Sequence, residues 1–496
     1  MTPTSQTSHY FSIALRSLKI LSISLPFMLL GCGSDNENAR QSPEPIAALP
    51  KGEFTAIEEL PNAKGLRLKH ITSLKQGIQT ADKGLILLGE ASSELHRDSV
   101  GFLLKLDQQL NILSQASDEL GYAGICQHSS GEYTLGKIVE VDEFIASNHL
   151  GVMLQRFSSE HQLLKETLLK DSLLEEYYEI NFNLETWPGT PFTISSNEET
   201  FSEIVFPGLN AHRFQPVILH CSGENLLVTF NHYGKKISWY NDQLELQWSD
   251  TLMLDNYAGS RTSFAKAPKV FISDTGHVFA ATNVNNFDIP AINHRFQLQL
   301  PAFNDYSSIS DNIFLKQWTS LGQTVSSSLL GTEFLDDVSG IAMVDNTLWL
   351  TAKSHMKKIN QANHTFEWDI SVFKLDPNTL NETEITNPIA IINVDQEDWL
   401  EGMNIFNNQL WLYGHNGYQQ VDSNSYTSNP KGFFGYLDLT ELTLNEVTSL
   451  EGPRATVIDA LINTEDSIIS LGITDGPITH TTDRSSQGFI NQKFLD

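Results

Sequence analysis

Short apolar segments separated by polar turn residues recur along most of the chain. A typical unit starts with a small residue and an apolar segment, passes a turn such as Asp82-Lys83-Gly84, and continues into a second, more apolar segment. Two small residues lie twelve positions apart in four units: Gly77 and Gly89, Gly124 and Gly136, Gly340 and Ala352, and Gly402 and Gly414. Apolar runs bounded by turn residues predict a strand, a tight turn and a second strand.

A third strand is expected after each hairpin, for example at 101–107 (GFLLKLD) and 432–438 (GFFGYLD), and a fourth usually follows, as at 244–248. Four short antiparallel strands repeated about seven times predict a β-propeller. The sequence therefore predicts an all-β fold, a single propeller with seven blades of four antiparallel strands. Residues 170–216 leave open an eighth, degenerate blade or an insertion. An array of β-sandwiches is the alternative, although separate sandwiches would not keep one spacing throughout.

The last unit supplies only three strands, two within 461–472 and a third at 488–494, before the sequence stops at Asp496. An outer strand without a partner exposes a row of unpaired backbone groups. We therefore expect a strand from within residues 53–71 to complete this blade and close the ring.

The turn glycines, apolar strands and Lys-Leu-Asp endings of these units resemble the kelch-like and D-G-G-type repeats of bacterial propellers. The resemblance spans about residues 65–496. It implies a fold and does not imply an activity.

The N-terminal region has a different pattern. Arg16 and Lys19 precede an eleven-residue apolar run at 20–30, which is too short to cross a bilayer core of about 30 Å. Such a pattern is typical of a cleavable export signal. The motif Leu29-Leu30-Gly31-Cys32 resembles the lipobox of bacterial lipoproteins. The resemblance implies cleavage before Cys32 and lipidation of that cysteine; an ordinary secretory signal is the alternative.

In lipoproteins an aspartate after the cysteine favours the inner membrane, so Gly33 implies the outer membrane, on its periplasmic side or at the cell surface. Residues 33–52 are polar and contain three prolines, as expected of a flexible tether. The expected organisation is a signal peptide (1–31), a lipidated N-terminus and tether (32–52) and a propeller domain (53–496).

One face of the propeller is expected to carry long loops. The links from second to third strands and between blades share that face. They are long at 283–311, 353–370, 415–431 and 473–487, and in the 160–216 stretch. Loops on a rigid scaffold commonly carry recognition. Polar residues follow directly after the predicted second strand in six units: Glu90, Lys137, Asn231, Asn283, Lys353 and His415. We interpret them as a ring of ligand-binding groups at the channel mouth; the alternative is that they are ordinary solvated loop starts.

Two cysteines and two histidines lie on predicted first strands of neighbouring units. Cys126 and His128 belong to the second unit, and His220 and Cys221 to the third. Neighbouring inner strands could bring them together. In an oxidising envelope Cys126 and Cys221 could form a disulfide. A Cys/His metal site is also possible, although the spacing fits no zinc motif. The leading interpretation is two unconnected buried cysteines and unrelated histidines.

Composition and charge exclude several classes of protein. Apolar residues make up 40% of the chain and charged residues 18%, enough for a core and too apolar for disorder. Acidic residues outnumber basic ones 60 to 31, giving a net charge of −29. Such a charge repels phosphate backbones, and no basic stretch with interleaved aromatic residues offsets it, so no nucleic-acid partner is expected.

The usual catalytic motifs are missing from the sequence, including H-E-x-x-H, the P-loop, G-x-G-x-x-G and G-x-S-x-G. No cofactor and no metal are expected. Acids gather before the first strands of late units, at Asp336, Asp337, Asp398, Glu401 and Asp459. They could bind a cation or form a carboxylate pair, but acidic loops are also common in so acidic a chain.

These features favour a non-catalytic binding or scaffold module for a protein, peptide or glycan, anchored at the outer membrane by lipid. The alternative is a periplasmic propeller enzyme with its site at the channel mouth. A hydrolase, a lyase and a quinone-dependent dehydrogenase are the classes considered, and the fold alone does not choose among them.

Overall fold

The computed structural model describes residues 51–52, 55–56, 72–92, 99–118, 120–141, 149–169, 217–231, 234–254, 268–285, 311–332, 335–360, 363–380, 385–394, 398–422, 425–451, 455–475 and 486–495. These residues belong to one structural unit, Ala48–Asp496. The lipobox with Cys32 and most of the expected tether lie outside them. No helix among the described residues is long and apolar enough to cross a membrane.

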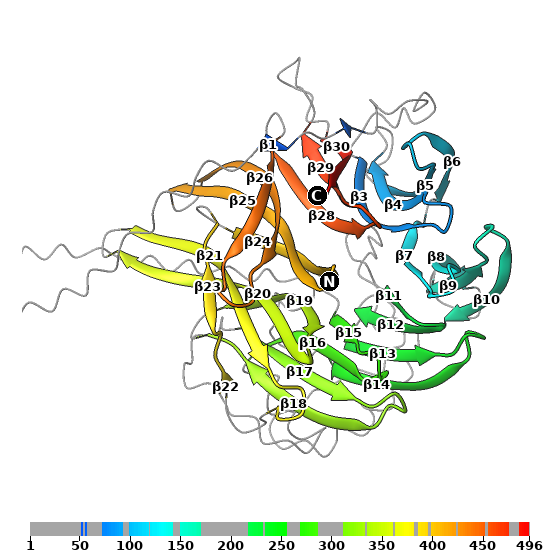
Figure 1. The fold of residues 1–496 in the computed structure, drawn as a ribbon, viewed down its shortest axis with the longest axis horizontal. Coiled ribbons are helices and arrows are strands. Elements are labelled where there is room, and N and C mark those ends of the chain that lie inside the picture. The colour runs from blue at the N-terminus through cyan, green and yellow to red at the C-terminus, as the bar shows by residue number, and fades with distance from the viewer. Residues whose placement is uncertain are drawn as a thin grey trace, which may run out of the picture. The chain divides into compact units, whose positions relative to one another are not determined.

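Strands form seven sheets arranged as the blades of a β-propeller, with the first strand of each blade nearest the central axis (Figure 1). Blade one contains β3 (Thr72–Gln79), β4 (Leu85–Ser92), β5 (Ser99–Leu106) and β6 (Ile112–Asp118). Blade two contains β7 (Tyr122–Gln127), β8 (Tyr133–Val141), β9 (His149–Phe157) and β10 (Leu163–Leu169). Blade three contains β11 (Val217–Ser222), β12 (Asn225–Asn231), β13 (Gly234–Tyr240) and β14 (Leu246–Leu254).

Blades four and six each carry a short fifth strand at their outer edge. Blade four contains β15 (Lys269–Ile272), β16 (Val278–Asn285), β17 (Asp311–Trp318) and β18 (Thr324–Leu330), with β22 (Ile385–Thr386) at its edge. Blade five contains β19 (Asp336–Val344), β20 (Thr347–Asn360), β21 (Asn363–Leu375) and β23 (Ala390–Ile392). Blade six contains β24 (Asp398–Phe406), β25 (Gln409–Asp422), β26 (Ser425–Leu437) and β27 (Leu444–Leu450), with β1 (Lys51–Gly52) at its edge. Blade seven contains β28 (Thr456–Asn463), β29 (Ser467–Asp475), β30 (Ser486–Phe494) and β2 (Thr55–Ala56).

The hydrophobic core lies between the blades. Leu227 and Trp239 of blade three, for example, pack with Val278 and Trp318 of blade four in one buried cluster. A blade buried on both faces needs apolar side chains at successive positions, which explains the runs seen in the second strands. Tight turns suit this packing: Asn407 and Asn408 both have positive φ angles (48° and 61°), as a two-residue hairpin turn of the primed type requires.

The N-terminal closure predicted from the sequence is confirmed. β2 pairs antiparallel with β30, with Thr55 opposite Ile490 and Ala56 opposite Phe489, so it supplies the fourth strand of blade seven. β28 of the same blade contacts β3 of blade one, which completes the ring. A second N-terminal strand, β1, pairs parallel with β27 of blade six. The paired segment thus starts two residues before the expected start of the body at residue 53.

The ring has seven blades, and the eighth-blade alternative is wrong. The inner strands β7 and β11, from blades two and three, contact each other directly, and a disulfide between Cys126 and Cys221 joins them. No blade can therefore lie between them, although residues 170–216 separate the two blades in the sequence.

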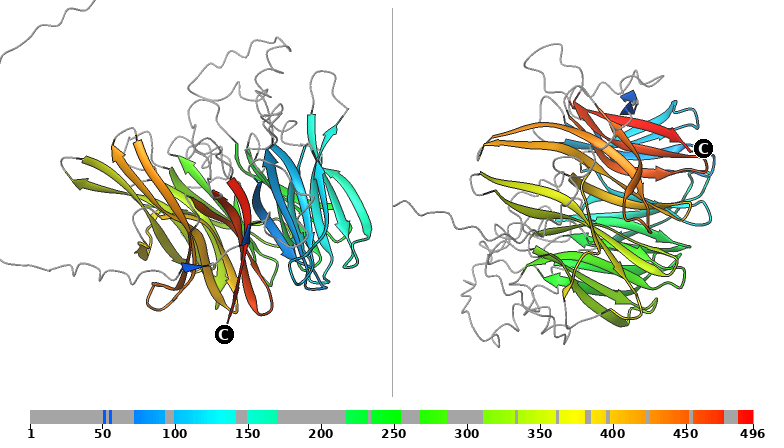
Figure 2. Two further views of the ribbon diagram at one scale, coloured as in Figure 1. Left: turned by 90° about the horizontal axis from the view of Figure 1, so that it is seen from above. Right: turned by 60° about the vertical axis from the view of Figure 1, so that its left-hand side comes forward.

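Two of the expected long loops are instead strands. Within 353–370 and 415–431, the hairpins β20–β21 and β25–β26 continue, with strands of 13 or 14 residues. They extend beyond the neighbouring blades (Figure 2). The apolar runs used to place the strands end before these extensions, whereas the backbone ladder continues through more polar sequence.

Candidate functional site

The six predicted ring residues lie inside the second strands and not just after them. Each of the pairs Glu90 with Ser73, Lys137 with Tyr122, Lys353 with Asp337 and His415 with Trp399 faces across the ladder between a first and a second strand. The ladder thus extends further than the apolar pattern indicated. As a result, polar ends of second strands stand beside the acidic starts of first strands, around the central channel.

Asn283 and Lys353 meet at a shared carboxylate. Asn283 Nδ2 donates to Asp337 Oδ1 at 2.9 Å, and its Oδ1 accepts from the Val338 amide at 3.0 Å. Lys353 Nζ lies 3.1 Å from Asp337 Oδ2, and the lysine side chain is only 7% exposed. The Asn283 amide therefore joins blade four to blade five, where it supports the ion pair between Asp337 and Lys353.

Lys353 also connects blade five to blade six. Its Nζ lies 3.8 Å from the centroid of the Trp399 ring, within the range of a cation–π interaction. Trp399 stacks with His415 at 5.9 Å and 18° between the planes, and Trp368 lies 5.7 Å from Trp399 between centroids. The lysine ammonium is thus held by one carboxylate and by aromatic faces.

The carboxyl groups of Glu401 in blade six and Asp459 in blade seven lie next around the ring. Glu401 Oε1 lies 3.8 Å from His415 Nδ1, and the Glu401 carbonyl oxygen accepts from Lys269 Nζ at 3.3 Å. Burial, and then the negative charge of Glu401, raise the pKa of Asp459 to about 7. Burial and the same two acids also raise the pKa of Tyr413 well above its usual value. Near neutral pH the Asp459 carboxyl is therefore poised between its protonated and ionised forms.

The last of these polar groups belong to blade one. Lys75 Nζ lies 2.7 Å from Glu90 Oε1, and both groups act electrostatically on Asp459. We call the resulting set the channel-mouth arc. It consists of Lys75, Glu90, Lys269, Asn283, Asp337, Lys353, Trp399, Glu401, His415 and Asp459. The arc alternates basic and acidic groups, so that most charges have a partner of opposite sign.

Two predicted ring residues lie apart from the arc. Lys137 forms an ion pair with Asp118 at 2.7 Å, between blades two and one. Asn231 pairs with Lys235 in the ladder of blade three, and its side chain lies outside the described set. The structure therefore gathers four of the six residues into the arc: Glu90, Asn283, Lys353 and His415.

Sequence reasoning missed Lys75, Lys269 and Trp399. Each lies on a first strand or at its start, whereas the search for polar positions followed the second strands. The acids Asp337, Glu401 and Asp459 had been noticed but were not assigned to partners. Aligning the first and second strands of each hairpin in antiparallel register would have paired these first-strand residues with the polar second-strand residues, because Asp337 faces Lys353 and Trp399 faces His415.

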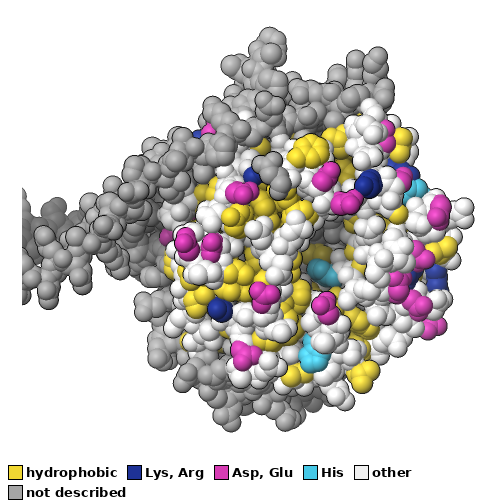
Figure 3. Space-filling view, viewed as in Figure 1, with side chains coloured by type: hydrophobic (Ala, Val, Ile, Leu, Met, Phe, Trp, Pro, Cys, Tyr) yellow, Lys and Arg dark blue, Asp and Glu magenta, His cyan; other side chains and the backbone are white. Residues whose placement is uncertain are grey.

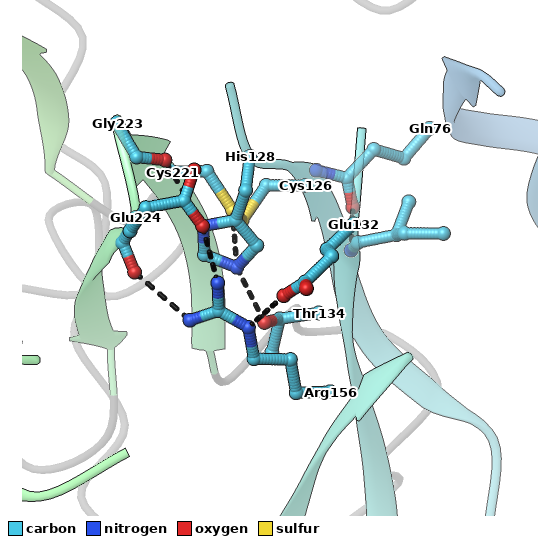
Figure 4. The surroundings of a disulfide bond; sticks show 10 residues. Gln76, Cys126, His128, Glu132, Thr134, Arg156, Cys221, Gly223 and Glu224 are labelled. Carbon is cyan, nitrogen blue, oxygen red and sulfur yellow. Dashed lines mark hydrogen bonds and ion pairs between the residues drawn. A yellow bond between two sulfur atoms is a disulfide. The ribbon is translucent and has the colours of Figure 1, made fainter. Parts of the chain in front are cut away.

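A second polar cluster lies on the opposite face, at the turns of blades two and three (Figure 4). Beside the disulfide, His128 Nε2 lies 2.8 Å from Thr134 Oγ1, and its Nδ1 lies 3.2 Å from the Gly223 carbonyl oxygen. Burial, and then the charge of Arg156, lower the pKa of His128. Because the two sulfurs bind each other, this cluster lacks the thiolates that a Cys/His metal site needs. No group of three His, Cys, Asp or Glu side chains suited to a metal occurs within the described ranges.

The face in Figure 3 is hollowed at its centre, and its acidic side chains are scattered around the hollow without forming one patch.

Burial, and then the charge of Lys269, lower the pKa of the inner-strand residue His220 to about 4, so its imidazole is neutral near pH 7.

No family model matches the chain, and no curated protein is significantly similar to it in sequence. Among solved structures, acylaminoacyl peptidase of Pyrococcus horikoshii is 8% identical, with 86% of this chain and 52% of that chain covered and a TM-score of 0.40. This chain thus spans about half the length of that peptidase. Kuenenia stuttgartiensis hydrazine synthase is 10% identical (80% and 92% covered, TM-score 0.40). The C-terminal WD40 domain of Sif2 is 7% identical (89% and 99% covered, TM-score 0.36).

Proposed function

We propose that this protein is a non-catalytic binding module of the bacterial envelope, which takes a polypeptide partner at the channel-mouth arc. The observation that carries the proposal is the arc itself: ion pairs and an aromatic cluster follow one another from blade four to blade one. Its composition suits a peptide, which brings amides, charges of both signs and apolar side chains to one surface. A protein or glycan partner remains the broader expectation from the sequence.

Charge compensation within the arc supports binding over catalysis. Asp337 is paired with Lys353, and Glu90 is paired with Lys75. Lys269 donates to the Glu401 backbone carbonyl, and His415 can pair with the Glu401 carboxylate when its imidazole is protonated. A carboxylate that is paired with a cation in this way is a poor proton acceptor. It can, however, exchange that ion pair for one with a charged ligand. Electrostatic complementarity of this kind gives specificity and speeds association more than it adds affinity.

Location is part of the proposal. The lipobox at 29–32 supports lipidation of Cys32, and Gly33 supports retention at the outer membrane. Several acyl chains hold a protein firmly at a membrane, because each buried CH₂ contributes about 0.8 kcal/mol. A propeller tethered in this way would present the arc to a partner in the periplasm or at the cell surface.

A pull-down from detergent-solubilised envelopes tests the binding function. We expect the wild type to capture a defined partner and the double variant K353M/E401Q to lose most of it, since two neighbouring ionic contacts are removed. K83M is the matched control, because Lys83 forms only an exposed ion pair with Glu465 in the turns of the opposite face. Equal capture by all three proteins would place the partner elsewhere, and no capture under several mild conditions would reject the binding function.

One observation favours a second candidate, a periplasmic hydrolase or lyase with its site in the channel. A carboxyl with its pKa raised to about 7, beside the second carboxyl of Glu401, has the properties of a general acid–base pair. On this alternative, D459N should abolish turnover of a substrate while leaving its binding intact. On the binding proposal, D459N leaves capture of the partner unchanged, since the asparagine keeps the shape of the protonated acid.

A further inference from the structure

A second concave site lies far from the arc, between blades three and four. It is a cavity of about 710 Å³ on the face formed by the short turns. The turns that line it follow β11, β13, β15 and β17. Its volume falls within the range of about 300–1,000 Å³ that is usual for small-molecule sites. The sequence pointed only to the opposite face, because the turns here are short and little varied in length.

Two tryptophans form one wall of this cavity. Trp239 and Trp248 face each other across β13 and β14, with their rings 6.2 Å apart between centroids and only 4° from parallel. Trp248 Nε1 donates to the Ser320 carbonyl oxygen at 3.1 Å, and Gly322 leaves room for the indole, since a Cβ there would lie 2.6 Å from it. The wall is therefore rigid before any ligand binds.

Apart from Ile272 and Leu321, the rest of the cavity is lined mainly by polar groups and glycines. Asn225 begins β12, and Asp274 and Thr275 are exposed in the turn between β15 and β16. Asn241, by contrast, is held within its own turn, where its Oδ1 accepts from the backbone amides of Gln243 and Glu245 and its Nδ2 donates to Glu245 Oε2. Asn225 and Asp274 form no hydrogen bond with any other described side chain, so both can bind a ligand.

The charges of the lining residues indicate which class of ligand the cavity can bind. None of the described residues lining the cavity is a lysine or an arginine, and Asp274 is its one acid. Phosphates, uronic acids and other anions would meet a carboxylate without a compensating cation. A neutral ligand that combines an apolar C–H face with several hydroxyl groups matches both the indole wall and the amide, carboxylate and hydroxyl groups opposite.

We propose that this inter-blade cavity binds a short neutral oligosaccharide. One sugar ring packs its C–H face against the exposed part of the Trp248 indole, which the buried Trp239 supports from behind. Its hydroxyl groups donate to the Asp274 carboxylate and exchange hydrogen bonds with the side chains of Asn225 and Thr275. The site is independent of the arc, because it lies on the other face and shares no residue with it.

Titration of the full folded body with defined probes tests this site. Saturation-transfer NMR and calorimetry with cellotriose, maltotriose, laminaritriose and triacetylchitotriose, each at up to about 10 mM, detect affinities down to the millimolar range. We expect at least one probe to bind. The double variant N225A/D274A should weaken that binding by about tenfold or more, since each lost hydrogen bond is worth roughly 0.5–1.5 kcal/mol. T275W should block the cavity and abolish binding.

The control is D242A, which removes an exposed aspartate from the β13–β14 turn on the same face, outside the cavity lining. None of these variants truncates a core side chain, so a melting curve equal to that of the wild type is expected for each. Binding that D242A preserves and that N225A/D274A and T275W reduce supports the site. Absence of binding by all four probes overturns the proposal, and so does binding that T275W leaves unchanged.

Discussion

Arg156 on β9 of blade two donates from Nη2 to Oε2 of Glu224, in the first turn of blade three, at 2.5 Å. The same guanidinium donates to Glu132 Oε2 (Figure 4). From Nη1 it also donates to the carbonyl oxygens of Glu224 and Asp242. Its side chain is 6% exposed. One buried side chain thus binds two turns of the neighbouring blade, a task for which the planar fork of arginine is better suited than the single ammonium of lysine.

Replacing Arg156 with methionine should destabilise the protein by about 1.5–3 kcal/mol, because a buried guanidinium that binds two partly exposed carboxylates and two carbonyl groups is lost. Urea unfolding measures the change. R156K should recover only part of the loss, since an ammonium cannot reach all four acceptors. K83M, which removes an exposed pair on the same face, should leave the midpoint unchanged. A midpoint for R156M equal to that of the wild type would contradict the role given to this residue.

The disulfide joins the same two blades from the inner side. Cys126 and Cys221 are separated by 95 residues, and cross-links that close long loops typically stabilise by about 2–4 kcal/mol. The variant C126A/C221A should therefore unfold at lower urea concentration than the oxidised wild type. Adding a reductant should shift the wild type in the same direction and leave the variant unaffected. A reductant effect of equal size on both proteins would mean that this bond is not its target.

Asp459 makes the stability of the fold depend on pH. Its pKa is about 7 in the folded protein, against 3.8 for an ordinary aspartate, so between these values the folded state binds more protons than the unfolded state. The free energy of unfolding should fall as pH rises through this window, by at most about 1.4 kcal/mol per pH unit from this group, and level off above pH 7.

Denaturant titrations at several pH values between 4 and 8 measure this contribution. D459N should remove it and so flatten the profile relative to the wild type. E401Q should shift the fall to lower pH, because a negative charge that raises the Asp459 pKa is lost. Parallel profiles for wild type and D459N would show that Asp459 titrates normally.

Closure by β2 should dominate the stability of the ring. Deleting residues 53–71 removes the partner of β30 and leaves an edge of unpaired backbone groups, so we expect a lower melting temperature or aggregation. Deleting residues 33–50, which precede β1, is the matched control and should be nearly silent. Equal melting temperatures for the two deletions would contradict the closure.

Anchoring can be tested at Cys32. C32S should block lipidation, and the protein should then appear in the soluble periplasmic fraction or accumulate as an uncleaved precursor, because the eleven-residue apolar run cannot span a bilayer. Fractionation and an immunoblot report both outcomes. A cleaved C32S protein that still sediments with membranes would show that another feature holds it there.

Strand order and blade number could be predicted from the sequence because each blade repeats the same short pattern, as at 101–107 and 432–438. Polar positions such as Lys353 and His415 could be found for the same reason. Their partners could not, since Asp337 faces Lys353 through ladder register and Glu401 comes near His415 at a register shift, and the repeat pattern specifies neither. Arg156 gave no signal at all: it is one charged residue in an apolar strand, and its main acceptor lies 68 residues away. Likewise, the cavity between blades three and four depends on how two blades pack.

The N-terminal segment binds two blades in succession, with β1 added to blade six and β2 to blade seven. Any tension along the polypeptide before Lys51 is therefore applied first to these two-residue strands. A pull on that segment acts on the pairings of β1 with β27 and of β2 with β30, and not on the long hairpins of blades five and six. Because each of the two pairings involves only two residues, β1 and β2 should detach under force before the hydrophobic cluster that packs blade seven against blade one is pulled apart.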